Sequence, residues 1–156
     1  MPEKKTLERA GKDKRGGKSA STQAGEFVRE EMDHVREGKH GARSAKQAIA
    51  IGLSKARRAG VKLPPPKNGK ASGRTRKPAA RDNAKGSKTP AHAPSRKRSR
   101  AVSNALKREG HAAASHTALS RQAHASARKR GAASRSRAAQ KAAATRQRRR
   151  KMSATE

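Results

Sequence analysis

Large apolar residues are concentrated between positions 27 and 63, where they recur with the period of an α-helix. A first set lies within residues 21–37 at positions i, i+4, i+8 and i+11, with one further apolar residue beside it. This spacing predicts a helix with one apolar face, and Gly38 stands where that helix would end. The members of the apolar set are Ala24, Val28, Met32 and Val35, with Phe27 beside them.

A second helical pattern follows a short polar link. Ser44 and Gln47 match the Ser-x-x-Gln capping box that opens many helices. Gly60 stands where a left-handed residue closes a helix, and Val61 stands where the hydrophobic contact of such a closure falls. Three prolines at 64–66 prevent the helix from continuing. The apolar face repeats the spacing of the first helix: Ala45, Ile49, Leu53 and Ala56.

Two amphipathic helices joined by a short link predict an αα-hairpin at about residues 21–63. Large apolar residues are few elsewhere, and a chain of low hydrophobicity and high net charge cannot offset about 1–2 kcal/mol of backbone entropy per residue. We therefore expect an all-α protein in which a small hairpin is flanked by largely disordered, highly basic segments, with helical potential in the C-terminal third.

Composition divides the flanking segments into three parts. Residues 1–20 are rich in Lys, Gly and Ser and are predicted to form a flexible basic arm. Residues 64–98 form a Pro/Lys/Arg/Ala linker that resembles the tails of linker histones in composition, and we expect it to be disordered. Residues 99–156 form an Ala/Arg/Lys-rich basic tail. Ala and Arg favour helices, but like charges repel, so this tail is expected to be helical mainly when bound.

Charge points to a polyanionic partner. The chain has 42 Lys and Arg against 11 Asp and Glu, a net charge of +31, and 24 of these charges belong to residues 61–156. Phe27 is the only aromatic residue, so a set of side chains for stacking on unpaired bases is lacking. This favours binding of the phosphate backbone, and duplex DNA over RNA. An RNA-associated or ribosome-associated role is the close alternative, because RNA phosphates offer the same charge.

Clusters of Lys and Arg are the candidate phosphate contacts. Four of them lie in the second helix of the hairpin, three at the end of the linker, and the others in the tail. The set is Lys46, Lys55, Arg57, Arg58, Arg96, Lys97, Arg98, Arg100, Lys107, Arg108, Arg128, Lys129, Arg130, Arg135, Arg137, Arg146, Arg148, Arg149, Arg150 and Lys151.

The hairpin admits two interpretations. It could be a helix-turn-helix whose second helix enters the major groove, but no third helix is evident, and Ile51 and Gly52 make a poor reading face. A packing or dimerisation unit is favoured. A lone hairpin of this size is marginally stable, which gives a physical motive for a homodimer through residues 21–63.

Catalytic and metal sites are not expected from this sequence. There is no cysteine, which excludes thiolate metal sites and cysteine catalysis. The six histidines include no i, i+4 pair of the kind that helical zinc sites use, so they are predicted to be free surface side chains. Glu30 and Glu31 are neighbours that point about 100° apart on a helix and cannot share one substrate. We therefore expect a non-enzymatic protein without a cofactor.

A membrane role is disfavoured. No apolar stretch has the length of a membrane-spanning helix, and the N-terminus lacks the apolar segment of a secretory signal. Binding to an anionic membrane surface is a weak alternative, since Val102, Leu106 and Leu119 are the only large apolar residues that the C-terminal helical stretches offer for insertion. We expect a cytoplasmic protein of the nucleoid.

The run RSAKQAIAIGLSKARRAG at residues 43–60 resembles the signature of a bacterial family of small, basic proteins of unknown function. Residues 26–41 resemble the helix that precedes this signature in its members. Members often carry the labels DNA-binding or plasmid-stabilisation protein. The resemblance implies no catalytic or ligand residue, and it adds plasmid maintenance as a further alternative to our leading hypothesis of a nucleoid-associated or DNA-compacting protein.

Overall fold

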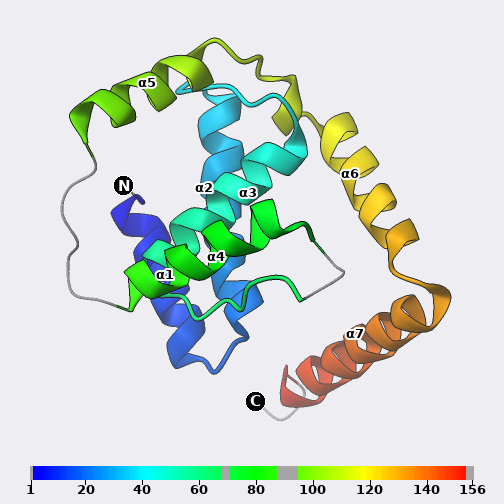
Figure 1. Ribbon diagram of the computed structural model, residues 1–156. Helices are drawn as coiled ribbons and strands as arrows, with labels where there is room; N and C mark the ends of the chain where they lie inside the picture. Colours follow the sequence, from blue (N-terminus) through cyan, green and yellow to red (C-terminus); the bar gives the residue numbers. More distant parts are fainter. Residues whose placement is uncertain (1, 68–70, 88–94, 154–156) are drawn as a thin grey trace. The chain divides into compact units, whose positions relative to one another are not determined.

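The computed structural model describes residues 2–67, 71–87 and 95–153, and its regular secondary structure is entirely helical (Figure 1). The chain divides into two units, residues 1–118 and residues 119–156. The described residues form seven α-helices and one 3₁₀ helix: α1 (Lys4–Arg15), α2 (Ala20–Arg36), α3 (Ala45–Arg58), α4 (Gly73–Gly86), α5 (Arg96–Lys107), η1 (Ala112–Ala114), α6 (His116–Lys129) and α7 (Ala132–Ser153).

Helices α2 and α3 are the predicted pair, and each begins at a serine cap. The Ser19 hydroxyl accepts a hydrogen bond from the backbone N–H of Thr22 at 3.3 Å. The Ser44 hydroxyl accepts one from Gln47 at the same distance, as expected. The Gln47 side chain, however, accepts from the backbone of Arg43 at 3.0 Å and not from Ser44, so the capping box is only half formed.

Both helices end in a left-handed glycine turn; the sequence predicts this conformation for Gly60 and only the end of the helix for Gly38. Gly38 has φ of 73° and Gly60 has φ of 88°, values that a residue with a Cβ rarely adopts. The residue after each glycine donates a hydrogen bond to a carbonyl five positions back, 3.0 Å to His34 and 3.1 Å to Ala56. The turn after α3 buries Val61.

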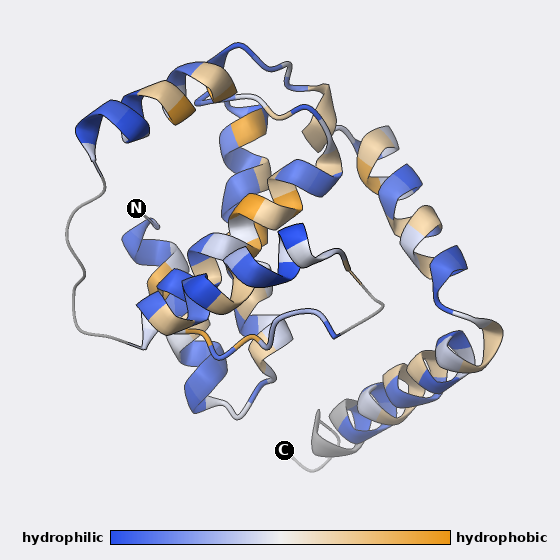
Figure 2. Ribbon diagram, viewed as in Figure 1, coloured by the Kyte–Doolittle hydropathy of each residue, from blue (hydrophilic) through white to orange (hydrophobic). Residues whose placement is uncertain are grey.

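The hairpin helices approach closely because α3 presents small residues to α2. A Cβ at Gly52 would lie 2.7 Å from the Cα of Val28. Phe27 is fully buried, which confirms it as a core residue, whereas Ile49 and Leu53 are only partly buried. Figure 2 shows the more hydrophobic residues gathered on α2 and α3. The buried core cluster comprises Ala10, Ala24, Phe27, Ala56 and Val61, with Ala20, Leu53 and Leu63 packed against it.

The expectation of a lone hairpin with largely disordered flanks is wrong, although the all-α class is confirmed. Helix α1 packs on α2, helix α4 packs on α3, and η1 contacts both helices of the hairpin. The added helices bury small or polar residues, so no stripe of large apolar residues announces them. Those buried residues are Thr6, Ala10 and Asp13 of α1, and Ala79 and Asp82 of α4.

Helix α4 is held to α3 and to the segment that follows α3 by polar contacts of two adjacent residues. The carboxylate of Asp82 accepts hydrogen bonds from the Ser54 hydroxyl at 2.6 Å and from Arg58 Nε at 2.8 Å. The Asn83 amide donates to the Leu63 carbonyl at 2.8 Å. Much of the predicted linker is therefore a docked helix, while its residues 68–70 and 88–94 lie outside the described residues.

The end of α5 and the segment after it are attached to the link between α2 and α3. The backbone N–H of Gly41 donates to the Leu106 carbonyl at 2.9 Å, and that of Ala42 donates to the Gly110 carbonyl at 3.0 Å. Ala114 of η1 is fully buried. Helix α5 itself buries no residue, so it is anchored through its C-terminal end.

The second unit contains α7 and most of α6. None of its described residues is buried, and both helices are rich in Ala and Arg, which are strong helix formers. In Figure 2 hydrophilic and mildly hydrophobic residues alternate along α7 without forming one apolar face. The tail, predicted to be helical mainly when bound, is thus helical in the chain alone.

Candidate nucleic-acid interface

The four basic residues predicted on α3 do not share one exposed surface. Lys55 Nζ lies 2.6 Å from Glu31 Oε2 and 3.3 Å from Glu30 Oε1, between α3 and α2. Arg57 is buried, and its Nε donates to the Leu63 carbonyl at 3.3 Å. Burial lowers the pKa of Arg57. These two side chains contribute to folding contacts.

The other two basic residues of α3 are more accessible. Arg58 pairs with Asp82 at 2.8 Å while 58% of its side chain stays exposed. Lys46 is exposed near the start of the helix. Since α4 also packs on α3, the helix presents little of the basic face that a major-groove recognition helix would need.

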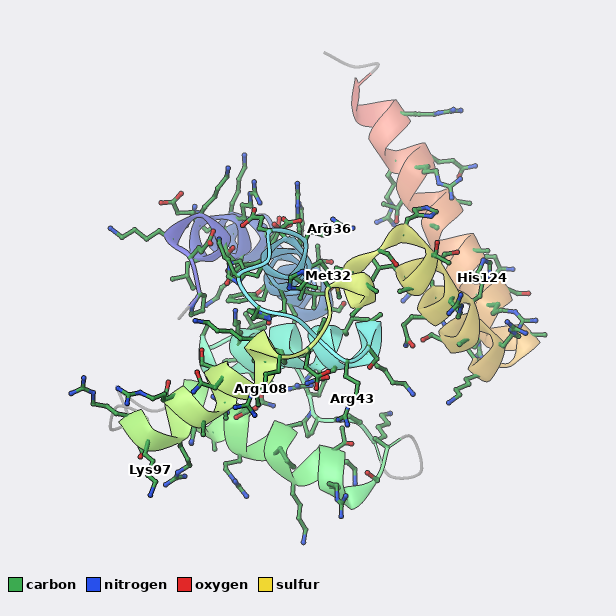
Figure 3. All side chains as sticks on the ribbon, turned by 90° about the horizontal axis from the view of Figure 1, so that it is seen from above. Met32, Arg36, Arg43, Lys97, Arg108 and His124 are labelled. Atoms are coloured by element: carbon green, nitrogen blue, oxygen red, sulfur yellow. The ribbon has the colours of Figure 1, made fainter. Side chains whose placement is uncertain are left out.

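The predicted contacts on α5 are all exposed. Arg96, Arg100 and Lys107 stand at i, i+4 and i+11, which places them on one face of the helix. In Figure 3 Lys97 extends outward from the end of α5, whereas Met32 lies inside the molecule. The six basic side chains of this segment are Arg96, Lys97, Arg98, Arg100, Lys107 and Arg108.

The second unit carries basic residues without acidic neighbours in sequence, since no Asp or Glu occurs from residue 110 to residue 155. Arg135 donates to the Ala127 carbonyl at 3.3 Å, which ties the start of α7 to the end of α6. The side chains of Arg149 and Lys151 lie outside those that the structure describes. The predicted contacts that are exposed here are Arg128, Lys129, Arg130, Arg135, Arg137, Arg146, Arg148 and Arg150.

Helix α4 carries a basic surface that sequence reasoning missed. Four exposed residues stand at i, i+3, i+7 and i+11 and therefore line one face, opposite the face that docks on α3. No ion pair found among the described residues involves them. The signal is the spacing of these basic residues, which lie in the segment that the sequence predicts to be a disordered linker. We call this face the α4 stripe; it consists of Arg74, Lys77, Arg81 and Lys85.

Acidic residues gather elsewhere, around the C-terminal half of α2. Glu3 Oε1 accepts hydrogen bonds from His34 Nε2 at 2.9 Å and from Lys39 Nζ at 3.0 Å. The bonds from His34 and Lys39, together with the charge of Lys39, hold the pKa of Glu3 at about 2. Five of the chain's 11 acidic residues lie in or beside this region: Glu3, Glu30, Glu31, Asp33 and Glu37.

Two of these carboxylates belong to consecutive residues, Glu30 and Glu31, and both are buried. Burial raises the pKa of Glu30, but hydrogen bonds from Thr6 and the Glu3 backbone and the charge of Lys55 outweigh it, so this pKa is lowered. Glu31 is 1% exposed, and its contacts are with two nitrogens: Oε2 lies 2.6 Å from Lys55 Nζ and Oε1 lies 3.0 Å from His40 Nε2. Glu30 is therefore held by several hydrogen bonds, and Glu31 by one ammonium and one imidazole.

Two histidines complete this buried group. Ligand atoms of Glu31, His34 and His40 all lie within 4.8 Å of one another, so this trio could hold a metal ion. The two imidazoles meet edge to face with ring centres 6.0 Å apart, and their side chains are only 12% and 16% exposed. These two histidines are thus not the free surface residues that their spacing predicted. The sequence signal for this arrangement is Gly38, because its turn brings His34 and His40 together although they are six positions apart.

Among the described residues, no helix is both long enough and apolar enough to cross a membrane.

Comparison with known proteins matches part of the chain to a protein family. No curated protein and no solved structure gives a significant match. Residues 12–68 match the model of a family of unknown function (DUF6496). The matched segment covers α2, α3 and the end of α1, and it includes the buried Glu, His and Lys side chains described above. Over these residues the chain is similar to a family whose activity is not established.

Proposed function

We propose that this protein binds duplex DNA through phosphate contacts, with little sequence preference and without catalysis, as a nucleoid-associated or DNA-compacting protein. The observation that carries the proposal is the α4 stripe, a row of exposed basic side chains fixed on a docked helix. Charged side chains whose backbone is already ordered lose less conformational entropy on binding than those of a disordered linker.

The length of the α4 stripe suits a nucleic-acid backbone. Its first and last residues are 11 positions apart, which corresponds to about 17 Å along a helix axis. Phosphates on one strand of B-form DNA recur about every 3.4 Å of axial rise, so the stripe spans about five base pairs. A row of this kind fixes orientation on a duplex without reading its sequence.

The distribution of the other side chains supports backbone contacts over base contacts. Phe27, the only aromatic residue of the chain, is fully buried and cannot stack on a base. Helices α5, α6 and α7 add exposed basic residues, and in α7 these occur on several sides of the helix. Such helices can neutralise phosphates from more than one direction, and this contribution to affinity does not depend on sequence.

The proposal predicts a specific change in salt dependence. Neutralising two residues of the α4 stripe, Lys77→Gln with Arg81→Gln, removes about two phosphate contacts. We expect weaker binding at fixed salt, and a slope of log affinity against log salt that is smaller by about 2. Fluorescence anisotropy with a labelled duplex at several salt concentrations measures both quantities.

A control variant removes the same charge from side chains that already have carboxylate partners. Arg9 pairs with Glu26, and Lys39 pairs with Glu3 and Glu37. We expect Arg9→Gln with Lys39→Gln to change the slope less than the α4 double variant does. Equal slopes for the two double variants would contradict a dedicated role of the α4 stripe, and a wild-type affinity insensitive to salt would contradict phosphate binding altogether.

Competition between duplex DNA and structured RNA at one salt concentration tests the choice of nucleic acid, since preference for RNA would overturn that part of the proposal.

A further inference from the structure

We propose that Glu31, His34 and His40 form a binding site for a divalent transition metal of the zinc class, at the C-terminal end of α2. This site is separate from the basic surfaces and does not depend on nucleic-acid binding. Its ligands would be one carboxylate oxygen and two imidazole nitrogens, a set that zinc uses in proteins.

Charge balance gives the first argument. Glu30 and Glu31 are 5% and 1% exposed, and among the residues that the structure describes Lys55 is the one ammonium within ion-pair distance of both. Two buried carboxylates and one ammonium leave a negative charge in excess, and buried charge is costly unless it is paired or bound to a metal. A divalent cation beside Glu31 would supply the missing positive charge.

The position of His40 gives the second argument. Its Nδ1 lies 3.0 Å from the Gly41 carbonyl, which can only accept, so Nδ1 carries the proton of that hydrogen bond. In the neutral ring, Nε2 then presents a lone pair toward Glu31 Oε1, 3.0 Å away. Two lone pairs that face each other at this distance need a cation between them, and a divalent metal ion can take that place. A backbone carbonyl on the second ring nitrogen is also the usual support of a metal-binding histidine.

The remaining contacts suit the same arrangement. Lys55 lies against Glu31 Oε2 and not Oε1, so the lysine can keep one carboxylate oxygen while a metal takes the other. Glu3 accepts from His34 Nε2, which in a neutral His34 leaves the lone pair on Nδ1. Ligand atoms of a tetrahedral zinc site are about 3.3 Å apart, so the trio must close by about 1–2 Å from its present spread of up to 4.8 Å.

The test is a titration of the metal-free full-length protein with Zn²⁺ in competition with a chromophoric chelator. We expect one tight site per chain. His34→Gln and His40→Gln should each weaken that site at least about 10-fold, because loss of a ligand costs no less than loss of a residue that supports one. His124→Gln, which changes an exposed histidine of α6 labelled in Figure 3, should leave the affinity unchanged.

A second measurement needs no variant and so does not depend on how variants fold. The ¹⁵N resonances of the six histidine side chains of the wild-type protein are followed during addition of Zn²⁺. We expect the first equivalent to shift those of His34 and His40 before the others. Absence of a tight site, shifts at other histidines first, or unchanged affinity in folded His34→Gln and His40→Gln variants would each overturn the proposal.

Discussion

At the scale of single residues, a basic side chain in this protein has one of two roles according to its neighbours. Lys46 and Lys55 are both lysines of α3 and are indistinguishable by charge alone. Lys46 is exposed, whereas Lys55 lies against the buried carboxylates of Glu30 and Glu31. Sequence reasoning assigned both to DNA because the partners of Lys55 stand 24 and 25 positions away, beyond the range of any local pattern.

This difference predicts opposite phenotypes for the same substitution. Lys55→Gln removes one partner of a buried ion pair and leaves two carboxylates without their ammonium, which should lower the free energy of unfolding by about 3 kcal/mol. Lys46→Gln is a surface change and should shift it by less than about 0.5 kcal/mol. Urea denaturation followed by circular dichroism measures both. Equal stability of the two variants would show that the contacts of Lys55 do not stabilise the fold.

At the scale of helices, close contact between α2 and α3 depends on one glycine. A Cβ added at Gly52 would lie 2.7 Å from Val28 Cα and 3.0 Å from the Phe27 carbonyl oxygen, and neither backbone atom can move alone. Gly25, on α2, has open space around the position of an added Cβ. The two glycines therefore differ in packing while both stand within helices.

We predict that Gly52→Ala destabilises the protein by about 1–3 kcal/mol, because it forces the two helices apart. Gly25→Ala should instead stabilise it by about 0.5–1 kcal/mol, since alanine loses less backbone entropy in a helix. Thermal and urea denaturation of both variants give the comparison. A stabilising Gly52→Ala would mean that α2 and α3 do not approach as closely as described.

The helices also show what a sequence pattern can and cannot reveal. Helices α2 and α3 could be predicted because large apolar residues recur along them and glycines mark their ends. Helices α1 and α4 could not, because they dock through Thr6, Asp13 and Asp82 and through small alanines. A polar anchor such as Asp82 is visible only once its partners Ser54 and Arg58 have been brought beside it by the fold. Periodicity of hydrophobic residues therefore finds the centre of this domain and misses the helices around it.

The same limit applies to the homodimer expected through residues 21–63. That expectation rested on the marginal stability of an isolated hairpin. The chain's own α1, α4 and η1 pack against this hairpin and bury part of its surface. The physical motive for dimerisation thus becomes weaker, and the added helices supply stability within one chain.

At the scale of the whole molecule, the second unit carries positive charge without buried residues of its own among those described. All the buried residues in the described parts of the chain precede residue 119. Residues 119–156 contribute 12 basic residues and one acidic residue, a net charge of +11. The second unit can therefore contribute to affinity for a polyanion while contributing little to the stability of the first.

Removal of residues 119–156 tests this separation. We expect the truncated protein to unfold at nearly the same urea concentration as the full chain, with a change of less than about 0.5 kcal/mol, because surface changes away from buried contacts have small effects. Its affinity for duplex DNA should fall, and the slope of log affinity against log salt should become smaller, since each lost phosphate contact removes about 0.9 from that slope. The α4 stripe remains, so some salt-dependent binding should persist. Complete loss of binding would assign all affinity to the second unit and contradict the role of α4, whereas a large loss of stability would show that residues 119–156 contribute to the fold of the first unit.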